Sequence, residues 1–304
     1  MHGNDKHLIR VSGFILAIEI NMPRSILCSF GVALVFQCLG QEPVTLPLVN
    51  PDTILQHFFP EVEALSEAYQ PGERLEYDFS YGLLDAAKAE IQLTELPPGE
   101  HGPRWHIDAR GRSTGTFSWF FKVDDHYQTT LDARTGLPLQ FVRNIHEGGY
   151  TLHQTYDFNW RKNIVQTTSS KRGNPAIESV FLLPGPTHDM ISSIYALRHA
   201  HFEGLQIGDT LRIPTFMDEE RFELKVIYAG EARPKVDGVR WDCLLFHPII
   251  QTGRIWKNPD DLAVYISNDA NRIPVLAKTR ILFGTVKMEL TNASGLRNPS
   301  ARRD

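Results

Sequence analysis

The stretch GERLEYDFSYGLLDAAKAEIQL (72–93) decides the fold class of this chain. Apolar side chains stand at every second position in both of its halves: Leu75, Tyr77, Phe79 and Tyr81, then Ala87, Ala89, Ile91 and Leu93. A period of two places alternate side chains on opposite faces of a strand. Residues 82–85, which begin with a glycine, separate the halves as a turn. The stretch therefore predicts a hairpin of two half-buried antiparallel strands.

The same alternation recurs along the chain as far as residue 291. It predicts strands at 104–112, 125–132, 138–147, 149–158, 210–217, 220–229, 239–250, 262–268, 273–281 and 283–291. Short strands separated by turns rich in Gly, Pro, Asn and Asp are typical of antiparallel sheets. We therefore predict a mainly β fold.

An internal repeat emerges when the chain is compared with itself at an offset of 136 residues. Identical residues then coincide at turns and strand starts: Gly72 with Gly208, Pro98 with Pro234, Trp105 with Trp241, Pro138 with Pro274 and Gly148 with Gly284. Turns and strand starts need particular backbone geometry, which favours duplication over the alternative, coincidence among β-rich segments. We predict two duplicated antiparallel β units, 72–159 and 208–292, forming a curved sheet or open barrel.

Three further segments precede, join and follow these units. Residues 160–207 are expected to form a linker with one helix at 187–203, where apolar side chains recur at helical spacing. Residues 41–71 form an N-terminal segment. The polar tail 293–304 is expected to be disordered.

The N-terminus carries an export signal. Arg24 precedes an apolar run at 26–39 that is too short to span a membrane. We expect residues 1–40 to be a signal peptide with translation starting at Met22. The mature protein would then have no membrane span and act in the periplasm or the outer cell envelope. Lipidation of a signal cysteine is the less favoured alternative. Cys243 is the one cysteine beyond residue 40, so no internal disulfide is expected.

Composition sets limits on function. Of 304 residues, 42% are hydrophobic and 22% charged, which is typical of a globular protein with a core. The formal net charge of −5 excludes a general nucleic-acid binder, which needs a basic surface.

Four stretches resemble one family: GERLEYDFSYGLLDAAKAEI (72–91), TGTFSWFFKVDDHYQTTLDARTGLPLQFVRNIHEGGY (114–150), GDTLRIPTFMDEERFELKVIYAG (208–230) and NRIPVLAKTRILFG (271–284). They are similar to the Domain-of-Unknown-Function 3108 family of exported bacterial proteins. The resemblance covers about 72–292. It implies a β-rich fold and a cell-envelope location, and it transfers no catalytic residue.

Asp125 and Asp261 form a candidate acidic site, because each ends an Asp-Asp pair and the 136-residue offset superposes the two. Carboxylates from both units could bind Ca²⁺ or act as general acid and base, with Glu147 as a further candidate. The favoured alternative is local hydrogen bonding to backbone N–H groups at a turn. Motifs for nucleophilic or nucleotide-dependent catalysis are absent from the sequence, so we assign no catalytic residue, metal site or cofactor.

The aromatic cluster around Trp119, Phe120 and Phe121 is the main binding candidate, with Trp256 near its counterpart in the second unit. So many large rings in a short strand cannot all be buried on one side, so at least one is expected to be exposed or to line a cavity. We predict a non-enzymatic protein that binds a lipid-like or glycan ligand in a β-lined groove. The alternatives are a carboxylate-dependent hydrolase of envelope polysaccharide and a scaffold for another envelope protein. Oligomeric state is left open.

Overall fold

The computed structural model of the chain describes residues 67–303, except 101, 116, 201, 250–261, 282 and 283. The predicted signal peptide 1–40, most of the segment 41–71, and the candidate residues Trp256 and Asp261 lie outside the described residues.

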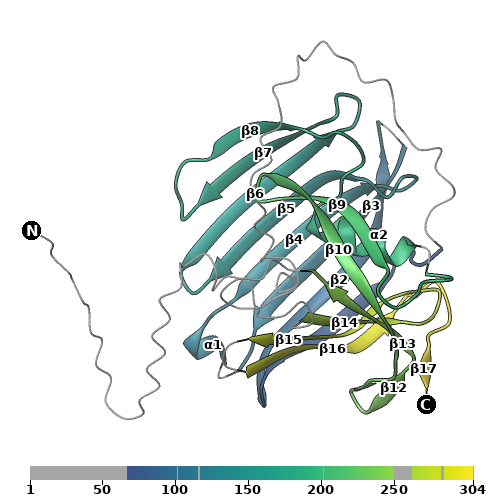
Figure 1. Cartoon of the computed structure of the whole chain (residues 1–304). Helices are drawn as coiled ribbons and strands as arrows, with labels where there is room; N and C mark the ends of the chain where they lie inside the picture. Colours follow the sequence, from purple (N-terminus) through teal and green to yellow (C-terminus); the bar gives the residue numbers. More distant parts are fainter. Residues whose placement is uncertain are drawn as a thin grey trace, which may run out of the picture.

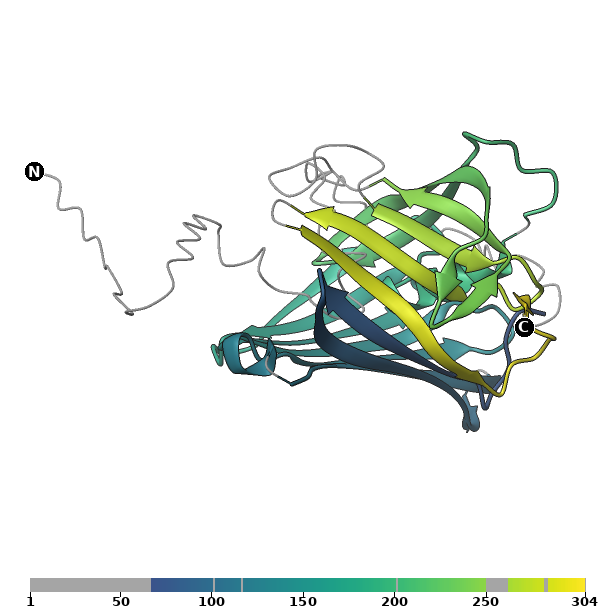
Figure 2. The same ribbon diagram turned by 90° about the horizontal axis from the view of Figure 1, so that it is seen from below.

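Fourteen strands of the described chain form one antiparallel sheet. Its first eight strands are β1 (Arg74–Tyr81), β2 (Leu84–Gly99), β3 (Gly102–Ser113), β4 (Asp124–Asp132), β5 (Pro138–Glu147), β6 (Tyr150–Asn159), β7 (Ile164–Lys171) and β8 (Ile177–Leu182). The other six are β9 (Thr210–Met217), β10 (Glu220–Ala232), β13 (Cys243–Pro248), β14 (Leu262–Ser267), β15 (Pro274–Ile281) and β16 (Gly284–Ser294). The sheet curls strongly (Figures 1 and 2), and its edge strands, β8 and β9, do not pair with each other. The predicted mainly β fold with a curved antiparallel sheet is confirmed.

Two meanders of similar design make up most of this sheet. Strands β1 to β6 follow one another in the first, and β9, β10 and β13 to β16 in the second. Strands β9, β10 and β15 begin 136 residues after β1, β2 and β5. Pairing of β1 with β16 joins the meanders into one sheet. Descent of both from one duplicated unit stays a prediction.

The segment 160–207 differs from the expected linker, because it contains β7 and β8, which extend the first meander, as well as a helix. This helix, α2 (Met190–His199), is shorter than the expected 187–203. Asp189 is its N-cap, and the Asp189 carboxylate and the Ser192 hydroxyl each accept a hydrogen bond from the other residue's backbone N–H. This reciprocal capping defines where the helix begins.

Helix α2 lies inside the curve of the sheet, where it contacts β4 and β9 (Figure 1). Strand residues that face this interior alternate with outward ones, as Trp105, Ile107 and Ala109 do on β3. The apolar core therefore lies between the concave face of the sheet and α2. None of the helices in the described part of the chain is long and apolar enough to cross a membrane.

The C-terminal tail differs from the expected disorder. A small second sheet joins β11 (Lys235–Val236), β12 (Val239–Trp241) and β17 (Arg302–Arg303). Before β17, the Asn298 side chain donates to the carbonyl of Glu67 over 2.7 Å, and its backbone N–H donates to Asn271 over 2.8 Å. These bonds order the tail, which polarity alone did not predict.

Candidate functional site

An apolar cavity of about 70 Å³ lies between α2 and the concave face of the sheet. Its walls come from α2 and from strands of both meanders, and include Leu75, Ile91, Ile194, Leu224, Phe246 and Ala277. The side chains with polar groups that border it are Ser193, Arg198, Tyr77 and Tyr195. The Tyr77 hydroxyl donates to the carbonyl of Pro274 over 3.1 Å, and the Tyr195 hydroxyl donates to Glu73 over 3.4 Å. The Ser193 hydroxyl donates to the carbonyl of Met190 over 2.9 Å, and Arg198 is bound to Glu73. These walls offer little to an ordered water and suit an apolar group.

The size of the cavity limits what it holds. A cavity of about 150 Å³ with similar apolar walls takes one benzene molecule in another protein. In proportion, about 70 Å³ has room for about three carbon atoms. In the described conformation the cavity therefore has room for the end of an apolar chain and is too small for a whole lipid.

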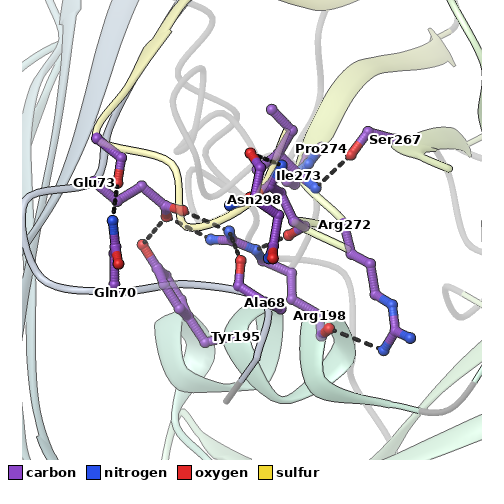
Figure 3. Close-up of polar contacts among 12 residues, drawn as sticks. Ala68, Gln70, Glu73, Tyr195, Arg198, Ser267, Arg272, Ile273, Pro274 and Asn298 are labelled. Carbon is purple, nitrogen blue, oxygen red and sulfur yellow. Dashed lines mark hydrogen bonds and ion pairs between the residues drawn. The ribbon is translucent and has the colours of Figure 1, made fainter. Parts of the chain in front are cut away.

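Arg198 fixes α2 beside this cavity (Figure 3). Its guanidinium makes two bonds of 2.6 Å to the carboxylate of Glu73, and both side chains are only 1% exposed. It also donates to the carbonyls of Asn271, over 3.0 Å, and Ala68, over 3.3 Å. The rings of Tyr69 and Tyr195 lie 5.1 and 5.0 Å from it. One cation thus joins the start of β1, helix α2 and the turn before β15.

The start of α2 is held by buried titratable groups. Thr129 on β4 donates to the Asp189 carboxylate over 2.9 Å. Burial raises the pKa of Asp189 to about 6, although hydrogen bonds from Ser192, Thr129 and Ile191 oppose the rise. Burial lowers the pKa of the neighbouring His188 to about 4. His188 also exchanges two backbone hydrogen bonds with β9, of 2.8 Å to Pro214 and 2.7 Å from Phe216, and so covers this edge of the sheet.

A row of inward polar side chains crosses the first meander. Pairing registers align Tyr127 on β4 with Arg143 on β5, Gln154 on β6 and Ser169 on β7. Arg143 is 1% exposed, and its Nε donates to Gln154 Oε1 over 2.6 Å. Gln154 in turn donates to the Ser169 hydroxyl over 3.1 Å. Arg143 also pairs with Asp218, which lies in the turn between β9 and β10 and reaches it from the other meander.

The carboxyl groups of Asp125 and Glu147 are buried neighbours, 1% and 2% exposed. Burial raises the pKa of Asp125, and the adjacent Glu147 carboxyl and the backbone N–H of His146, which donates to Asp125 over 3.0 Å, oppose the rise. This backbone N–H belongs to β5, 21 residues further along the chain, so the bond joins two strands and is not the local turn bond that was expected. Asp261 lies beyond the described residues. Glycosidase carboxyls need separations of about 5 Å or more and access to a sugar, which a buried adjacent pair does not provide.

The aromatic cluster lies at one end of the sheet and not in a strand. Trp119 belongs to the short helix α1 (Phe117–Phe120) and is 86% exposed, so it does not line the interior cavity. Phe121 packs against Gly148 in the turn between β5 and β6. The side chain of Phe120 is outside the description. The expectation of an exposed ring holds for Trp119, but the expected position in a β-lined groove is corrected.

Sequence reasoning missed Arg143 and Arg198, and each had a signal. Arg143 stands at an inward position of the alternating run Phe141, Arg143, Ile145. Arg198 stands seven residues after the buried Ile191 and three after Tyr195, which places all three on one helical face. A charged residue on an apolar face indicates a buried partner, yet the sequence does not say which acid supplies it.

A model of the family described as "Protein of unknown function (DUF3108)" matches residues 76–291, more than two thirds of the chain. The chain belongs to the DUF3108 family. The resemblance found in the sequence is therefore confirmed, and the DUF3108 match spans both meanders. The family description names no activity.

Solved structures similar to this DUF3108 protein share little sequence with it. A β-barrel-like protein of the domain of unknown function DUF1849 from Brucella abortus is 11% identical, with a TM-score of 0.46, covering 77% of this chain and 98% of that chain. A protein with a YmcC-like fold from Bacteroides fragilis is 9% identical, with a TM-score of 0.35, covering 76% of this chain and 100% of that chain. Among curated proteins none matches.

Proposed function

We propose that this DUF3108 protein is an exported, non-enzymatic binder of an apolar chain, and that the cavity between α2 and the sheet receives the end of that chain. The observation that carries the proposal is the cavity itself, whose polar border groups are already hydrogen-bonded within the protein. The predicted signal peptide supports the exported location. A glycan suits this cavity less well than a lipid-like chain, because sugar hydroxyls need polar partners.

The strength of binding follows from the size of the cavity. Three buried carbon atoms at about 0.8 kcal/mol each give about 2.4 kcal/mol, which is about 60-fold in Kd. The remainder of the chain would have to bind elsewhere on the protein, so the cavity supplies selectivity for an apolar end. This contribution to the binding free energy is lost when a larger side chain fills the cavity.

Ala277→Leu tests the proposal, because Ala277 lines the cavity and the substitution adds three carbon atoms to it. Titration with dodecanol, followed by isothermal calorimetry, is expected to give about 60-fold weaker binding than for the unaltered protein. Ala263→Leu on the adjacent strand β14 is the matched control, since Ala263 alternates with the inward Leu262 and Val264 and is only half-buried. Equal affinities of the two variants for dodecanol, or no binding to the unaltered protein, would refute the proposal.

A further inference from the structure

The turn between β9 and β10 is strained and closes over Arg143. Strand β9 ends at Met217 and pairs there with Glu220, so Asp218 and Glu219 alone form the turn. Both have positive φ, 52° and 68°, as a two-residue turn of this type requires. Asn-Gly is the usual choice at such positions, because other side chains raise the conformational energy there. Asp218 pairs with Arg143 and donates its backbone N–H to Tyr156 over 3.1 Å.

Arg143 and Asp218 differ in how firmly they are placed. The Arg143 side chain is 2% exposed and held by Gln154, whereas the Asp218 side chain is 55% exposed. A buried guanidinium needs an anion beside it, and both carboxylate and phosphate oxygens fit its parallel N–H groups. Asp218 supplies this anion from an exposed turn, so it can leave and be replaced without moving Arg143.

A second buried group beside Arg143 lacks a partner. The hydroxyl of Tyr127 makes no hydrogen bond to any part of the chain that the structure describes, and Tyr127 is 1% exposed. Its pKa is raised well above the usual value by burial, with the charge of Asp125 adding to the rise, so the hydroxyl keeps its proton. A buried O–H without an acceptor is costly, and an incoming oxyanion would supply one.

One cross-strand row contains both Arg143 and two residues of the cavity wall. Pairing aligns Leu75, Ile91, Ala109, Tyr127 and Arg143 on strands β1 to β5. Leu75 and Ile91 line the cavity. Three strand spacings separate Ile91 from Arg143, which is about 14 Å along the sheet. A medium-length alkyl chain spans that distance.

We propose that Arg143 binds the anionic head group, a carboxylate or a phosphate, of the chain whose apolar end enters the cavity, and that Asp218 occupies this position in the unliganded protein. The inference rests on the proposed function. Exchange of one anion for another keeps the charge balance of the interior, and the Tyr127 hydroxyl becomes a second donor to the head group. Release of Asp218 also frees the strained turn to move away from β5.

Dodecanoate, dodecyl phosphate and dodecanol distinguish the head-group site from the cavity. The variant Asp218→Asn removes the internal anion and suits positive φ, and Glu219→Gln in the same turn is the matched control. With Asp218→Asn we expect at least tenfold tighter binding of dodecanoate, dodecyl phosphate or both by calorimetry, with dodecanol within twofold. Which anion gains more identifies the head group. Glu219→Gln should leave all three affinities within twofold.

The double variant Arg143→Met with Asp218→Asn removes both charges, so no buried charge is left unpaired. It is expected to fold, as judged by circular dichroism, and to lose the preference for the anions over dodecanol. If dodecanol binds but the preference for the anions over dodecanol is unchanged in either variant, the inference is wrong and the proposed function stands. Absence of dodecanol binding overturns the proposed function and the inference together.

Discussion

Replacement of Glu73 by Gln tests how the fold holds α2 in place. The substitution keeps the size of the side chain but removes the charge that pairs with Arg198, in two bonds of 2.6 Å between groups that are each 1% exposed. Breaking a buried pair by removing one partner costs about 3–5 kcal/mol, because the remaining charge stays buried. For a protein of this size each kcal/mol lowers Tm by about 2–4 °C, so Glu73→Gln should lower Tm by about 6–20 °C.

Thermal and urea unfolding, followed by circular dichroism at neutral pH, measure this loss. Glu90→Gln is the matched control, because Glu90 pairs with Arg74 over 3.0 Å in a bridge that is 45% and 40% exposed. An exposed pair of this kind contributes less than about 1 kcal/mol. A double variant, Glu73→Leu with Arg198→Met, should be more stable than Glu73→Gln, since it leaves no buried charge. If Glu73→Gln costs no more than Glu90→Gln, the reasoning about the buried pair is wrong.

Gly295→Ala, at φ +65°, places a Cβ 2.0 Å from the carbonyl oxygen of Gly72 and should lower the free energy of unfolding in urea by about 3 kcal/mol. The control Gly149→Ala, at φ +88° with open space around it, should lower it by about 1 kcal/mol. Equal costs would contradict the steric reason. Burial of His188 lowers its pKa from 6.5 to about 4, so the contribution of His188 to stability is lost as pH falls through about 4. Burial of Asp189 raises its pKa to about 6, so the contribution of Asp189 to stability is lost as pH rises through about 6. Urea unfolding measures both effects. Between pH 4 and 6.5 the free energy of unfolding of His188→Leu should fall by about 3 kcal/mol relative to that of the unaltered protein, and that of Asp189→Asn should rise by about 3 kcal/mol. Curves parallel to that of the unaltered protein would contradict the assignment. Trp119→Ala should change Tm by less than 2 °C and leave dodecanol affinity within twofold, because Trp119 is 86% exposed and does not line the cavity; a large loss of affinity would place the ligand at α1.

The strands were predictable because their side chains alternate between an apolar interior and solvent. Leu75, Tyr77 and Phe79 of the opening stretch are all buried on β1. Strands β7 and β8 escaped prediction because β7 buries the polar Thr167 and Ser169 next to Val165, and β8 leaves Ile177 and Val180 exposed. Their hydrophobic pattern is therefore weak. Pairing of β7 with β6, and of β8 with β7, holds them in the sheet.

The candidate site was less predictable than the fold. Period-two patterns indicate which face of a strand points inward, but they do not say which strands a helix covers. The cavity depends on α2 packing within the curve of the sheet, which is fixed by contacts between distant residues such as Arg198 and Glu73. The aromatic run at Trp119 met the expectation of an exposed ring. It forms a helical turn, whereas the sequence analysis counted its rings as those of a short strand.

A crystal structure of the protein with bromine-labelled dodecanol, in which anomalous scattering locates the end of the chain, tests the proposed binding most directly. We expect the bromine between Ile194 on α2 and Ala277 on β15, in the cavity. Bromine found solely on the outer surface, beside Trp119 or elsewhere, with the cavity unchanged, would contradict the proposed binding.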